Sequence, residues 1–559
     1  MKKNIIYLGL VLISISTHLC SCMQDYDSSI KEPTRYTVND IKSYADIFKV
    51  FWTIMDQRYN YFYEQKRKDE LDWNAVYKEY YPKFAALKSY NVAGVNDTQI
   101  QTDTEKAAEY FGEIINPIID RHFYVEISMP YSTSRYNVTY TFSGGMNDAR
   151  PNIYSFEAKY GYKKDKLNDM ESYFYEGSYR KMTYLIGRLK SNPDIYYFSY
   201  DNFSLAHFLK ISIEDKYLSP APGNKLVLTP AEIENSVQLN TINDINKRNE
   251  VKNFTINILN EWNSFFSSNE VKTFNTHIGT FKTTEKLSDS FLALTQHLLD
   301  RSQNLIKYNE NSTYQPVLNN ETVDYITWFK NKMNIHVKSG YNLDLFQIVA
   351  NKILTNSPFY KKFLNPLHKG EIKKLILDLR GNGGGSVLDA RFLIDRFITK
   401  STIAYYQRTK EGNGRFNYTP WVPVQVKPHQ FGIPSNIPIV ILTDRGSGSM
   451  SELSTLMLKS QGSQVISIGD YSTGATAGLG GDDDFNGGIR DVVAGGILNF
   501  NMPLMAVKNL DNNVIEGIGI KPDIYVTPPS DTELEQMTNS PKTFLDRVMD
   551  EAVTYLSLK

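Results

Sequence analysis

The chain after residue 35 begins with apolar and polar positions spaced as in a helix. In IKSYADIFKVFWTIMDQRYNYF the apolar positions recur at steps of three and four, which is typical of an amphipathic helix: Ile41, Ala45, Phe48, Phe51, Trp52 and Met55. The segments DWNAVYKEYYPKFAAL and TDTEKAAEYFGEIINPII have the same period. We therefore expect a helical N-terminal domain over residues 36–118.

The last part of the chain changes to short apolar runs that alternate with helical segments. One run, residues 374–379, ends in the glycine-rich segment RGNGGG and is followed by the helical pattern VLDARFLIDRFI. A second run, residues 438–442, leads through TDRGSGSMSE into the helical pattern LSTLMLKS. This alternation predicts an α/β core over residues 341–559, with a C-terminal helix. Residues 119–205, which include the strand pattern DIYYFSYDNFSL, are expected to contribute its first part.

The segment between these parts, residues 206–340, is rich in Asn, Ser, Thr and Lys and has no chemical motif. Stretches such as NFTINILNEWNSFF and SFLALTQHLL predict helices. We interpret the segment as an insertion or accessory region. A cover over substrate and a purely structural packing element are both consistent with this sequence, and packing is the favoured interpretation.

The N-terminus has the pattern of an export signal. Lys2 and Lys3 precede IIYLGLVLISI, an apolar run that is too short to span a bilayer and suits a signal peptide. It leads into Leu-Cys-Ser-Cys ending at Cys22, which resembles a bacterial lipobox. We expect a signal peptide over residues 1–21, lipidation of Cys22, a polar tether over residues 22–35 and a location in the bacterial cell envelope, at the outer membrane or periplasmic face. An ordinary signal peptide cut nearby is the alternative.

Composition narrows the possible partners and chemistry. The 559 residues carry 61 Lys and Arg against 62 Asp and Glu, so there is no bulk positive charge to attract nucleic acid. The two cysteines, Cys20 and Cys22, both lie in the signal segment. The mature chain is therefore expected to contain no disulfide, no cysteine nucleophile and no cysteine-based metal site. We expect neither a metal nor a cofactor.

Ser449 stands where a predicted strand turns into a predicted helix. At such a position the helix dipole and the first free N–H groups stabilise negative charge on an oxygen. The pattern Ser449-x-x-Glu452 is also a helix capping box, which taken alone is the commoner role for such a serine. The upstream glycine turn can bring backbone N–H groups close to an oxyanion or a phosphate.

Four ordered motifs together resemble the C-terminal processing, or tail-specific, serine peptidases. They are LDLRGNGGG, DRGSGSMSE, VISIGDYSTGATAG and VIEGIGIKPDIYV. The N-terminal helices and IIDRHFYV are similar to the corresponding region of lipoprotein members. The resemblance implies a ClpP/crotonase-like α/β fold with Ser449, rather than Ser447 or Ser451, as the nucleophile. It further implies an oxyanion hole from the N–H groups of Gly383 or Gly384 and of Met450.

One position departs from the Ser/Lys pattern of that family. In Ser/Lys members a lysine follows the glycine of the segment after the nucleophile helix, and here Ala475 occupies that position. Lys459 is ten residues along the predicted helix, about 15 Å from Ser449 at 1.5 Å per residue. A Ser/Lys dyad is therefore not expected.

The tricorn-like branch of the family pairs its serine with an upstream histidine, and the sequence Asp120-Arg121-His122 resembles that motif. By this resemblance His122 is the general base, because a neutral imidazole can accept the serine proton near neutral pH. A structural role for His122 is the alternative. Arg121 stands where the family commonly has a small residue, and its guanidinium is expected to lower the pKa of the imidazole. Glu516 resembles the family's late glutamate and is the third expected member, although a turn glutamate would look the same.

The resemblance therefore implies a serine endopeptidase that cleaves polypeptides, often unstructured ones, by acyl transfer. No peptide-binding PDZ segment is evident between His122 and the glycine turn. Two other classes stay open. One is a peptidase-fold lipoprotein that binds peptides without hydrolysing them, which Ala475 and Arg121 favour. The other is a carbohydrate-handling envelope protein, suggested by the 38 Tyr and 29 Phe residues, for which no carboxylate pair can be located.

Overall fold

The computed structural model describes residues 36–134, 136–145, 154, 156–176, 181–214, 216–220, 223, 225–478 and 488–559. The chain divides into two units built from segments that are distant in sequence. Unit 1 comprises Met1–Ala149, Tyr406–Pro423 and Gly474–Gly517, and unit 2 comprises Arg150–Tyr405, Val424–Thr473 and Ile518–Lys559. The expected signal peptide, Cys22 and the tether lie outside the described residues. None of the helices described is long and apolar enough to cross a bilayer.

Unit 1 packs helices against an antiparallel sheet. The helices expected before residue 118 are formed as α2 (Tyr44–Arg58), α3 (Phe62–Lys68), α4 (Trp73–Ala86) and α5 (Asp97–Ile115). Side chains at the helix starts satisfy free N–H groups: Ser43 accepts from Asp46, and Asn96 accepts from Gln99. The sheet has the order β11-β12-β1-β2, formed by β11 (Gly488–Val493), β12 (Leu498–Pro503), β1 (Tyr124–Pro130) and β2 (Asn137–Ser143).

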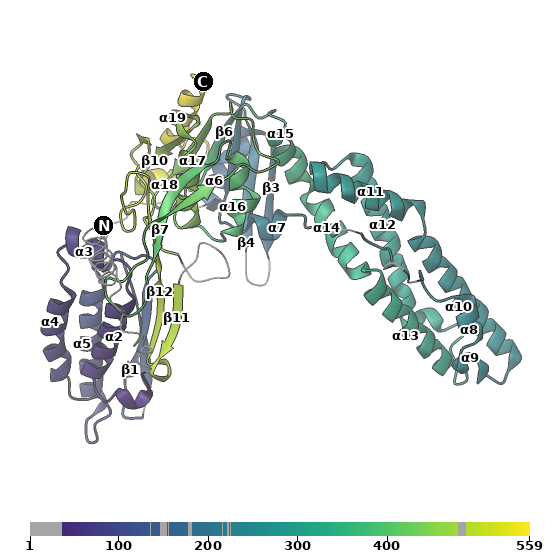
Figure 1. Cartoon of the computed structure of the whole chain (residues 1–559), viewed down its shortest axis with the longest axis horizontal. Helices are drawn as coiled ribbons and strands as arrows, with labels where there is room; N and C mark the ends of the chain where they lie inside the picture. Colours follow the sequence, from purple (N-terminus) through teal and green to yellow (C-terminus); the bar gives the residue numbers. More distant parts are fainter. Residues whose placement is uncertain are drawn as a thin grey trace, which may run out of the picture. The chain divides into compact units, whose positions relative to one another are not determined.

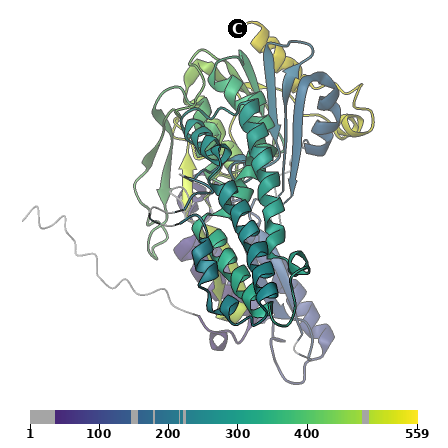
Figure 2. The ribbon, with the colours of Figure 1, turned by 90° about the vertical axis from the view of Figure 1, so that its right-hand side faces the viewer.

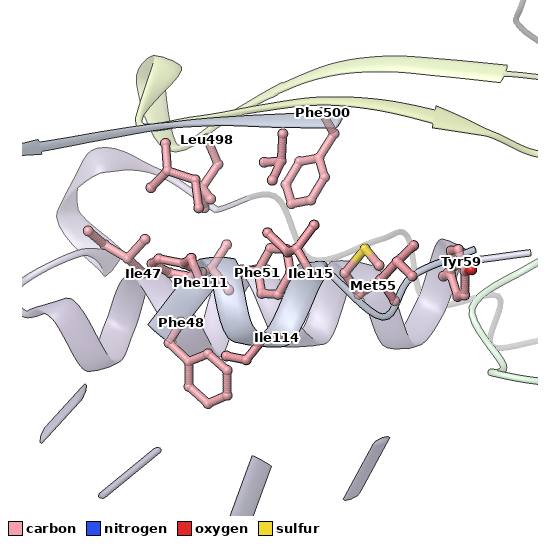
Figure 3. Close-up of a cluster of buried hydrophobic side chains, with 14 of the residues drawn as sticks. Ile47, Phe48, Phe51, Met55, Tyr59, Phe111, Ile114, Ile115, Leu498 and Phe500 are labelled. Carbon is pink, nitrogen blue, oxygen red and sulfur yellow. The ribbon is translucent and has the colours of Figure 1, made fainter. Parts of the chain in front are cut away.

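The core of unit 1 lies between these helices and the sheet. Figure 3 shows the apolar side of α2 facing strand side chains that come from the far end of the sequence. Phe51 stacks on Phe500 with ring centroids 6.1 Å apart, and it also meets Phe111 of α5 edge to face at 5.4 Å. The β11–β12 hairpin is therefore part of the same core as the N-terminal helices.

Unit 2 is built on a seven-stranded sheet with the order β14-β10-β9-β6-β5-β4-β3. The first five strands are parallel to one another, and β5, β4 and β3 are antiparallel. The strands are β3 (Leu167–Glu176), β4 (Lys181–Leu189), β5 (Ile195–Tyr200), β6 (Lys374–Asp378), β9 (Ile439–Thr443), β10 (Val465–Gly469) and β14 (Ile524–Tyr525). Every residue of β5 and β9 is buried, as expected for strands covered on both faces.

Helices connect and cover these strands. They are α6 (Phe156–Lys163), α16 (Leu388–Phe392), α17 (Met450–Lys459), α18 (Asp531–Asn539) and the C-terminal α19 (Arg547–Ser557). The helix expected over VLDARFLIDRFI is shorter than its periodicity suggests, because it ends at Phe392 and continues only as a 3-10 turn, Ile394–Phe397. Arg396 takes part in this ending: its side chain donates to the Phe392 carbonyl at 2.7 Å and forms two hydrogen bonds with Glu285.

The segment between β5 and β6 is helical throughout most of its length. It contains α7 (Leu205–Leu209), α8 (Pro230–Glu234), α9 (Val237–Asn240), α10 (Ile245–Phe266), α11 (Asn269–Thr284), α12 (Asp289–Ile306), α13 (Val323–Gly340), α14 (Leu343–Phe359) and α15 (Asn365–His368). A five-residue π-helix, Tyr360–Leu364, joins α14 to α15. The long helices run alongside one another (Figure 1, Figure 2).

The chain passes between the units along β7 (Thr402–Thr409) and β8 (Val422–Val426). In unit 1, the end of β7 pairs antiparallel with β13 (Met505–Lys508). The remaining short elements are 3-10 turns at Val38–Asp40, Lys164–Lys166, Lys307–Asn309, Asn311–Tyr314, Gly462–Gln464 and Ala494–Gly496. The fold is thus the mixed α/β class with a helical N-terminal region that the sequence predicted.

Candidate active site

The turn from β9 into α17 places Ser449 in an unusual backbone conformation. Ser449 is the residue before the helix and has φ of 51° and ψ of −116°. A non-glycine residue in such a region costs about 1–3 kcal/mol, and strain of this kind is common where a side chain is presented for chemistry. Glu452 Oε2 accepts the Ser449 N–H at 3.0 Å, as in the capping box that the sequence pattern suggested.

The three serines of GSGSMS have different surroundings. Ser447 is fully buried and donates to the Leu379 carbonyl at 2.8 Å. Ser451 is also fully buried and donates to the Asn382 carbonyl at 2.7 Å. Ser449 alone among the three is partly exposed. Of the three hydroxyls, its hydroxyl is therefore the one that an incoming group could reach.

The glycine turn after β6 lies directly against this serine. Gly384 has φ of 100°, and a Cβ added there would lie 2.7 Å from both Met450 N and Ser449 Cβ. Only glycine fits, because no side chain can be accommodated at that distance. The Gly384 N–H donates to Asn382 Oδ1 at 2.9 Å. By contrast, the N–H groups of Gly383 and Met450 donate to no group among the described residues.

Asn382 connects the glycine turn to the nucleophile helix. It is fully buried, its amide nitrogen donates to the Tyr200 carbonyl at 2.9 Å, and its own carbonyl accepts from Gly448 N at 3.1 Å. Its side-chain oxygen accepts from both Gly384 N and Ser451 Oγ. Sequence analysis did not single out Asn382, because two of the segments it connects, at Tyr200 and at Gly448–Ser451, are distant from it in the chain.

A buried ion network holds the start of the glycine turn. Arg380 is fully buried and pairs through two nitrogens with Asp378 and through two with Asp546 of the C-terminal segment. Lys163 also pairs with Asp546, at 2.9 Å. Burial by itself would raise the pKa of Asp378, but Arg380 and Lys159 hold that pKa below its ordinary value. Both carboxyls therefore stay ionised, as a buried pair requires.

The loop after β10 is tied to the nucleophile helix by a side-chain link. Ser472 Oγ donates to Glu452 Oε1 at 2.6 Å and accepts from Ile520 N at 2.6 Å. Lys459, at the other end of α17, donates to Asp523 at 2.9 Å and to Ser467. Its amine is thus hydrogen-bonded at the far end of the helix. This agrees with the expectation that Lys459 is not the general base for Ser449.

The expected base and the expected glutamate lie together in unit 1. His122, Glu516 and Asp120 each have a ring nitrogen or carboxylate oxygen within 4.8 Å of one another. Asp120 Oδ1 accepts the N–H groups of His122 at 2.9 Å and of Phe123 at 3.0 Å, which fixes the short turn carrying the imidazole. The His122 carbonyl accepts from Asn501 Nδ2 at 2.7 Å. Sequence resemblance had pointed to His122 and Glu516 but not to a role for Asp120.

Glu516 is a buried carboxylate, not a surface turn residue. It is 2% exposed. One oxygen accepts the Arg121 N–H at 3.0 Å, and the other accepts the N–H groups of Thr476 at 2.6 Å and Ala477 at 2.9 Å. Burial raises the pKa of Tyr61 well above its ordinary value, so its hydroxyl stays protonated and donates to Glu516 at 3.4 Å. These donors all stabilise the ionised form of Glu516.

The other two ionisable groups of this cluster are shifted toward their neutral forms. Burial lowers the pKa of His122 to about 4 and raises the pKa of Asp120 to about 7. The cause of the lowered histidine pKa is therefore burial, and not the Arg121 guanidinium that the sequence suggested. Arg121 donates to the Gly517 carbonyl at 3.1 Å. Asp120 Oδ2 and His122 Nδ1 are buried and have no hydrogen-bond partner among the described residues.

A carboxylate, an imidazole and a second carboxylate are also donor types that divalent metals accept. In this cluster, however, one Glu516 oxygen already receives the Thr476 and Ala477 N–H groups together with two hydroxyls. That oxygen therefore has little capacity left for a metal ion.

The predicted site residues therefore form two groups. Ser449, Met450, Gly383 and Gly384 belong to unit 2, and His122 and Glu516 belong to unit 1. Ala475, which stands in the position of the family lysine, also belongs to unit 1 and is 7% exposed.

The segment that carries Ser449 and the glycine turn is similar to a known protein family. Residues 345–526 match the model of peptidase family S41. This segment is an S41 peptidase domain. It contains β6, the glycine turn, the Ser449 elbow and Glu516, whereas Asp120 and His122 lie upstream of it.

Curated relatives of the S41 domain carry peptidase names. The carboxy-terminal processing protease CtpB of Bacillus subtilis (strain 168) is 28% identical over 171 residues, which is 30% of this chain and 31% of that protein. A protein named as a CtpA-like serine protease in Staphylococcus aureus (strain N315) is 29% identical over 182 residues, 32% of each chain. The chain thus matches about a third of the length of these relatives. At the level of the family, the S41 domain is that of a serine peptidase.

A solved structure is similar over most of the chain. It is a candidate peptidase from Parabacteroides merdae ATCC 43184, with 15% sequence identity, coverage of 92% of this chain and 97% of the other, and a TM-score of 0.46.

Proposed function

We propose that this chain is a serine endopeptidase that hydrolyses polypeptides by acyl transfer through Ser449. The observation that supports this most strongly is the Ser449 elbow: a partly exposed serine on a strained backbone lies against the glycine turn, and the N–H groups of Gly383 and Met450 have no acceptor among the described residues. Two such donors suit the oxyanion of a tetrahedral intermediate. Gly383 is preferred over Gly384 as the donor because the Gly384 N–H is used by Asn382.

In the proposed reaction His122 accepts the Ser449 Oγ proton while Oγ forms a bond to the substrate carbonyl carbon. The carbon–nitrogen bond then breaks, and His122 returns the proton to the leaving amine. In the second half of the reaction His122 takes a proton from a water molecule, whose oxygen bonds to the acyl carbon; the bond from that carbon to Oγ breaks, and His122 returns the proton to Ser449 Oγ. Ser449 and His122 belong to different units, so their pairing rests on the chemistry of each group and on the family resemblance.

The roles of the neighbouring acids follow from their protonation. Glu516, whose two oxygens accept backbone N–H groups, would as a carboxylate stabilise the imidazolium that forms when His122 takes the proton. Asp120, whose pKa is raised to about 7, is largely neutral in mildly acidic solution and would hold the His122 turn through Oδ1 without adding a second full negative charge. Because the pKa of His122 is lowered to about 4, the base is expected to stay deprotonated, and the enzyme active, down to about pH 5.

A peptide-binding protein without hydrolysis is the second candidate. It is favoured by Ala475 at the lysine position and by the low basicity of His122. The two candidates differ in one measurable property, which is turnover. We would follow cleavage of casein by the chain without residues 1–21, beside Ser449→Ala, His122→Ala and Ala475→Lys.

Cleavage by the parent chain that disappears in both alanine variants supports the Ser449–His122 proposal. Loss of cleavage in Ser449→Ala alone would show that a residue other than His122 is the base. An inert parent chain whose Ala475→Lys variant cleaves would indicate a decayed Ser/Lys enzyme. If no form cleaves, the peptide-binding candidate is favoured.

We further propose that the chain is anchored by lipid at Cys22 and faces the cell envelope. The support is the lipobox-like Leu-Cys-Ser-Cys pattern. Metabolic labelling with a fatty acid should mark the parent chain and leave Cys22→Ser unlabelled. Labelling of both chains, or of neither, would contradict the proposal.

A further inference from the structure

The helical segment between β5 and β6, residues 205–368, begins directly beside the glycine turn; we call it the helical arm. Phe203, two residues before the arm, is fully buried and forms two hydrogen bonds with the turn. Its N–H donates to the Gly384 carbonyl at 2.8 Å, and its carbonyl accepts from Ser386 N at 2.7 Å. A Cβ added at Gly385 would lie 2.7 Å from the Phe203 carbonyl oxygen. The root of the arm and the turn therefore lie in direct backbone contact.

The shape of this turn must be set by hydrogen bonds, because local sterics restrict it little. The three successive glycines, residues 383–385, have no Cβ, and the last two have φ of 100° and 141°. The orientation of the Gly383 N–H, the oxyanion donor proposed above, therefore depends on partners outside this run. Asn382 supplies one partner through Gly384 N, and Phe203 supplies the two hydrogen bonds described above.

A buried carboxylate fixes the root of the arm. Asp389 of α16 is fully buried, and its two oxygens accept the first two N–H groups of α7, from Leu205 at 2.5 Å and from Ala206 at 2.7 Å. The first N–H groups of a helix have no partner within the helix, so a carboxylate is a favourable acceptor for them. Asp389 thus joins the chain two residues after Phe203 to the chain five residues after Gly384.

The other end of α7 is held by a long helix of the arm. Asn356 of α14 is 1% exposed, and its amide nitrogen donates to the carbonyls of Phe208 at 2.8 Å and Leu209 at 3.1 Å. These carbonyls belong to the last turn of α7, where a helix leaves its acceptors free. α7 packs against both α16 and α14 (Figure 1). A path of hydrogen bonds therefore runs from α14 through α7 to the glycine turn.

We propose that α7 positions the oxyanion turn, and that Asp389 and Asn356 are the positioning residues that hold its two ends. The proposal rests on the proposed peptidase function, and it gives the arm a role other than a substrate cover or simple packing. Both residues act through Phe203, which fixes the Gly384 carbonyl and so limits rotation of the glycine run. A loosened run would stabilise the oxyanion less without changing how the substrate binds, so kcat falls and KM does not.

The test measures how fast Ser449 reacts separately from how many chains are folded. With a fluorophosphonate probe, Ser449 Oγ bonds to phosphorus, fluoride leaves, and the phosphoryl oxygen takes the place of the oxyanion. The extent of labelling at completion counts the intact sites. The second-order rate constant reports how well each intact site supports the reaction. A merely structural role would lower the extent and leave the rate constant unchanged.

The main variant is Asp389→Asn, which keeps the side-chain outline but points an amide NH₂ at one of the two N–H donors of α7. We expect the labelling rate constant and the kcat for casein each to fall about tenfold, with the KM for casein unchanged. Asp395→Asn is the matched control. Asp395 is a buried aspartate of the 3-10 turn after α16 that pairs with Arg391 at 3.6 Å, and its variant should react as the parent does.

A second variant approaches the turn from the arm, so the test does not depend on the folding of Asp389→Asn. Asn356→Leu removes the two donors without leaving a cavity. We expect the labelling rate constant to fall about threefold, a smaller effect because Asp389 still holds the start of α7. Asn351→Leu is the control. Asn351 is exposed on the same helix, where its amide donates to the Gln347 carbonyl at 2.9 Å, and its variant should label at the parent rate.

Parent-like rate constants in both Asp389→Asn and Asn356→Leu would overturn the proposal, whatever the extent of labelling. A raised KM with an unchanged kcat, or an equal fall in the control variants, would also overturn it. A parent chain that takes the probe and cleaves casein, with variants that react as fast, rejects only the positioning role. A parent chain that neither takes the probe nor cleaves casein rejects the proposed peptidase function and this proposal with it.

Discussion

The two halves of the proposed active site are held by different kinds of interaction. Around Ser449 the structure relies on backbone shape: a strained turn, a glycine that admits no side chain, and neutral hydrogen bonds through Asn382. Around His122 it relies on two buried carboxyl groups, Asp120 and Glu516, each of which accepts backbone N–H groups. The nucleophile half should therefore respond mainly to changes in shape, and the base half mainly to changes in charge and pH.

The largest expected effect is on the reaction itself. Ser449→Ala should reduce casein cleavage by at least about a thousandfold, because no other hydroxyl of the elbow is exposed to act in its place. The fold should be retained, as judged by circular dichroism. Ser290→Ala, an exposed serine of α12, is the control and should cleave as the parent does. Substantial cleavage by Ser449→Ala would show that Ser449 is not the nucleophile.

The next effect separates two adjacent glycines of the same turn. Gly384→Ala should lower the free energy of unfolding by about 3 kcal/mol or more, because its Cβ would meet Met450 N and Ser449 Cβ at 2.7 Å. A Cβ at Gly383 meets nothing within 4 Å, so Gly383→Ala should change stability by no more than about 0.5 kcal/mol. Urea denaturation of both variants measures the difference. Equal losses of stability in the two variants would show that backbone shape does not control the stability of the nucleophile half.

In the base half, a substitution that removes a charge but keeps the side-chain shape should still lower stability and activity. Glu516→Gln preserves the side-chain outline, but both Glu516 oxygens accept backbone N–H groups. Either orientation of the new amide therefore points its NH₂ at an N–H donor. We expect a loss of about 2 kcal/mol in urea denaturation, together with slower cleavage. Glu105→Gln, exposed on α5, is the control. A Glu516→Gln chain as stable as the control would contradict the role given to these hydrogen bonds.

The smallest net effect is on stability against pH, because two shifts oppose each other. The folded pKa of His122 is lowered to about 4, so the unfolded chain binds more protons and stability falls as pH drops from about 6.5 to 4. The folded pKa of Asp120 is raised to about 7, so the folded chain binds more protons and stability falls as pH rises from about 4 to 7. In the parent chain these trends partly cancel.

Variants of the two groups should uncover the opposing trends. Relative to the parent, Asp120→Asn should gain stability as pH rises from about 4 to 6.5, and His122→Ala should lose stability across the same range. Thermal unfolding over this pH range measures both slopes. Variant curves that run parallel to that of the parent would show that neither group titrates as the buried cluster requires.

The sequence by itself predicted the parts of the site that are contiguous in the chain. The strand patterns before RGNGGG and before GSGSMS correspond to β6 and β9, and the elbow at Ser449 follows from a strand meeting a helix within a few residues. These features depend on local backbone geometry and on an apolar run that must be buried. The helical N-terminal region was predictable for the same reason, since its period is visible in each segment.

Only the tertiary structure decided which polar groups are already in use. It showed that Gly384 N donates to Asn382, that Lys459 is engaged by Asp523, and that Asp120 and Glu516, nearly 400 positions apart, share one buried cluster. A motif states which donors and acceptors exist. Their occupancy and their pKa values depend on partners brought together from distant segments and on how much water is excluded there, and no local pattern of residues encodes either.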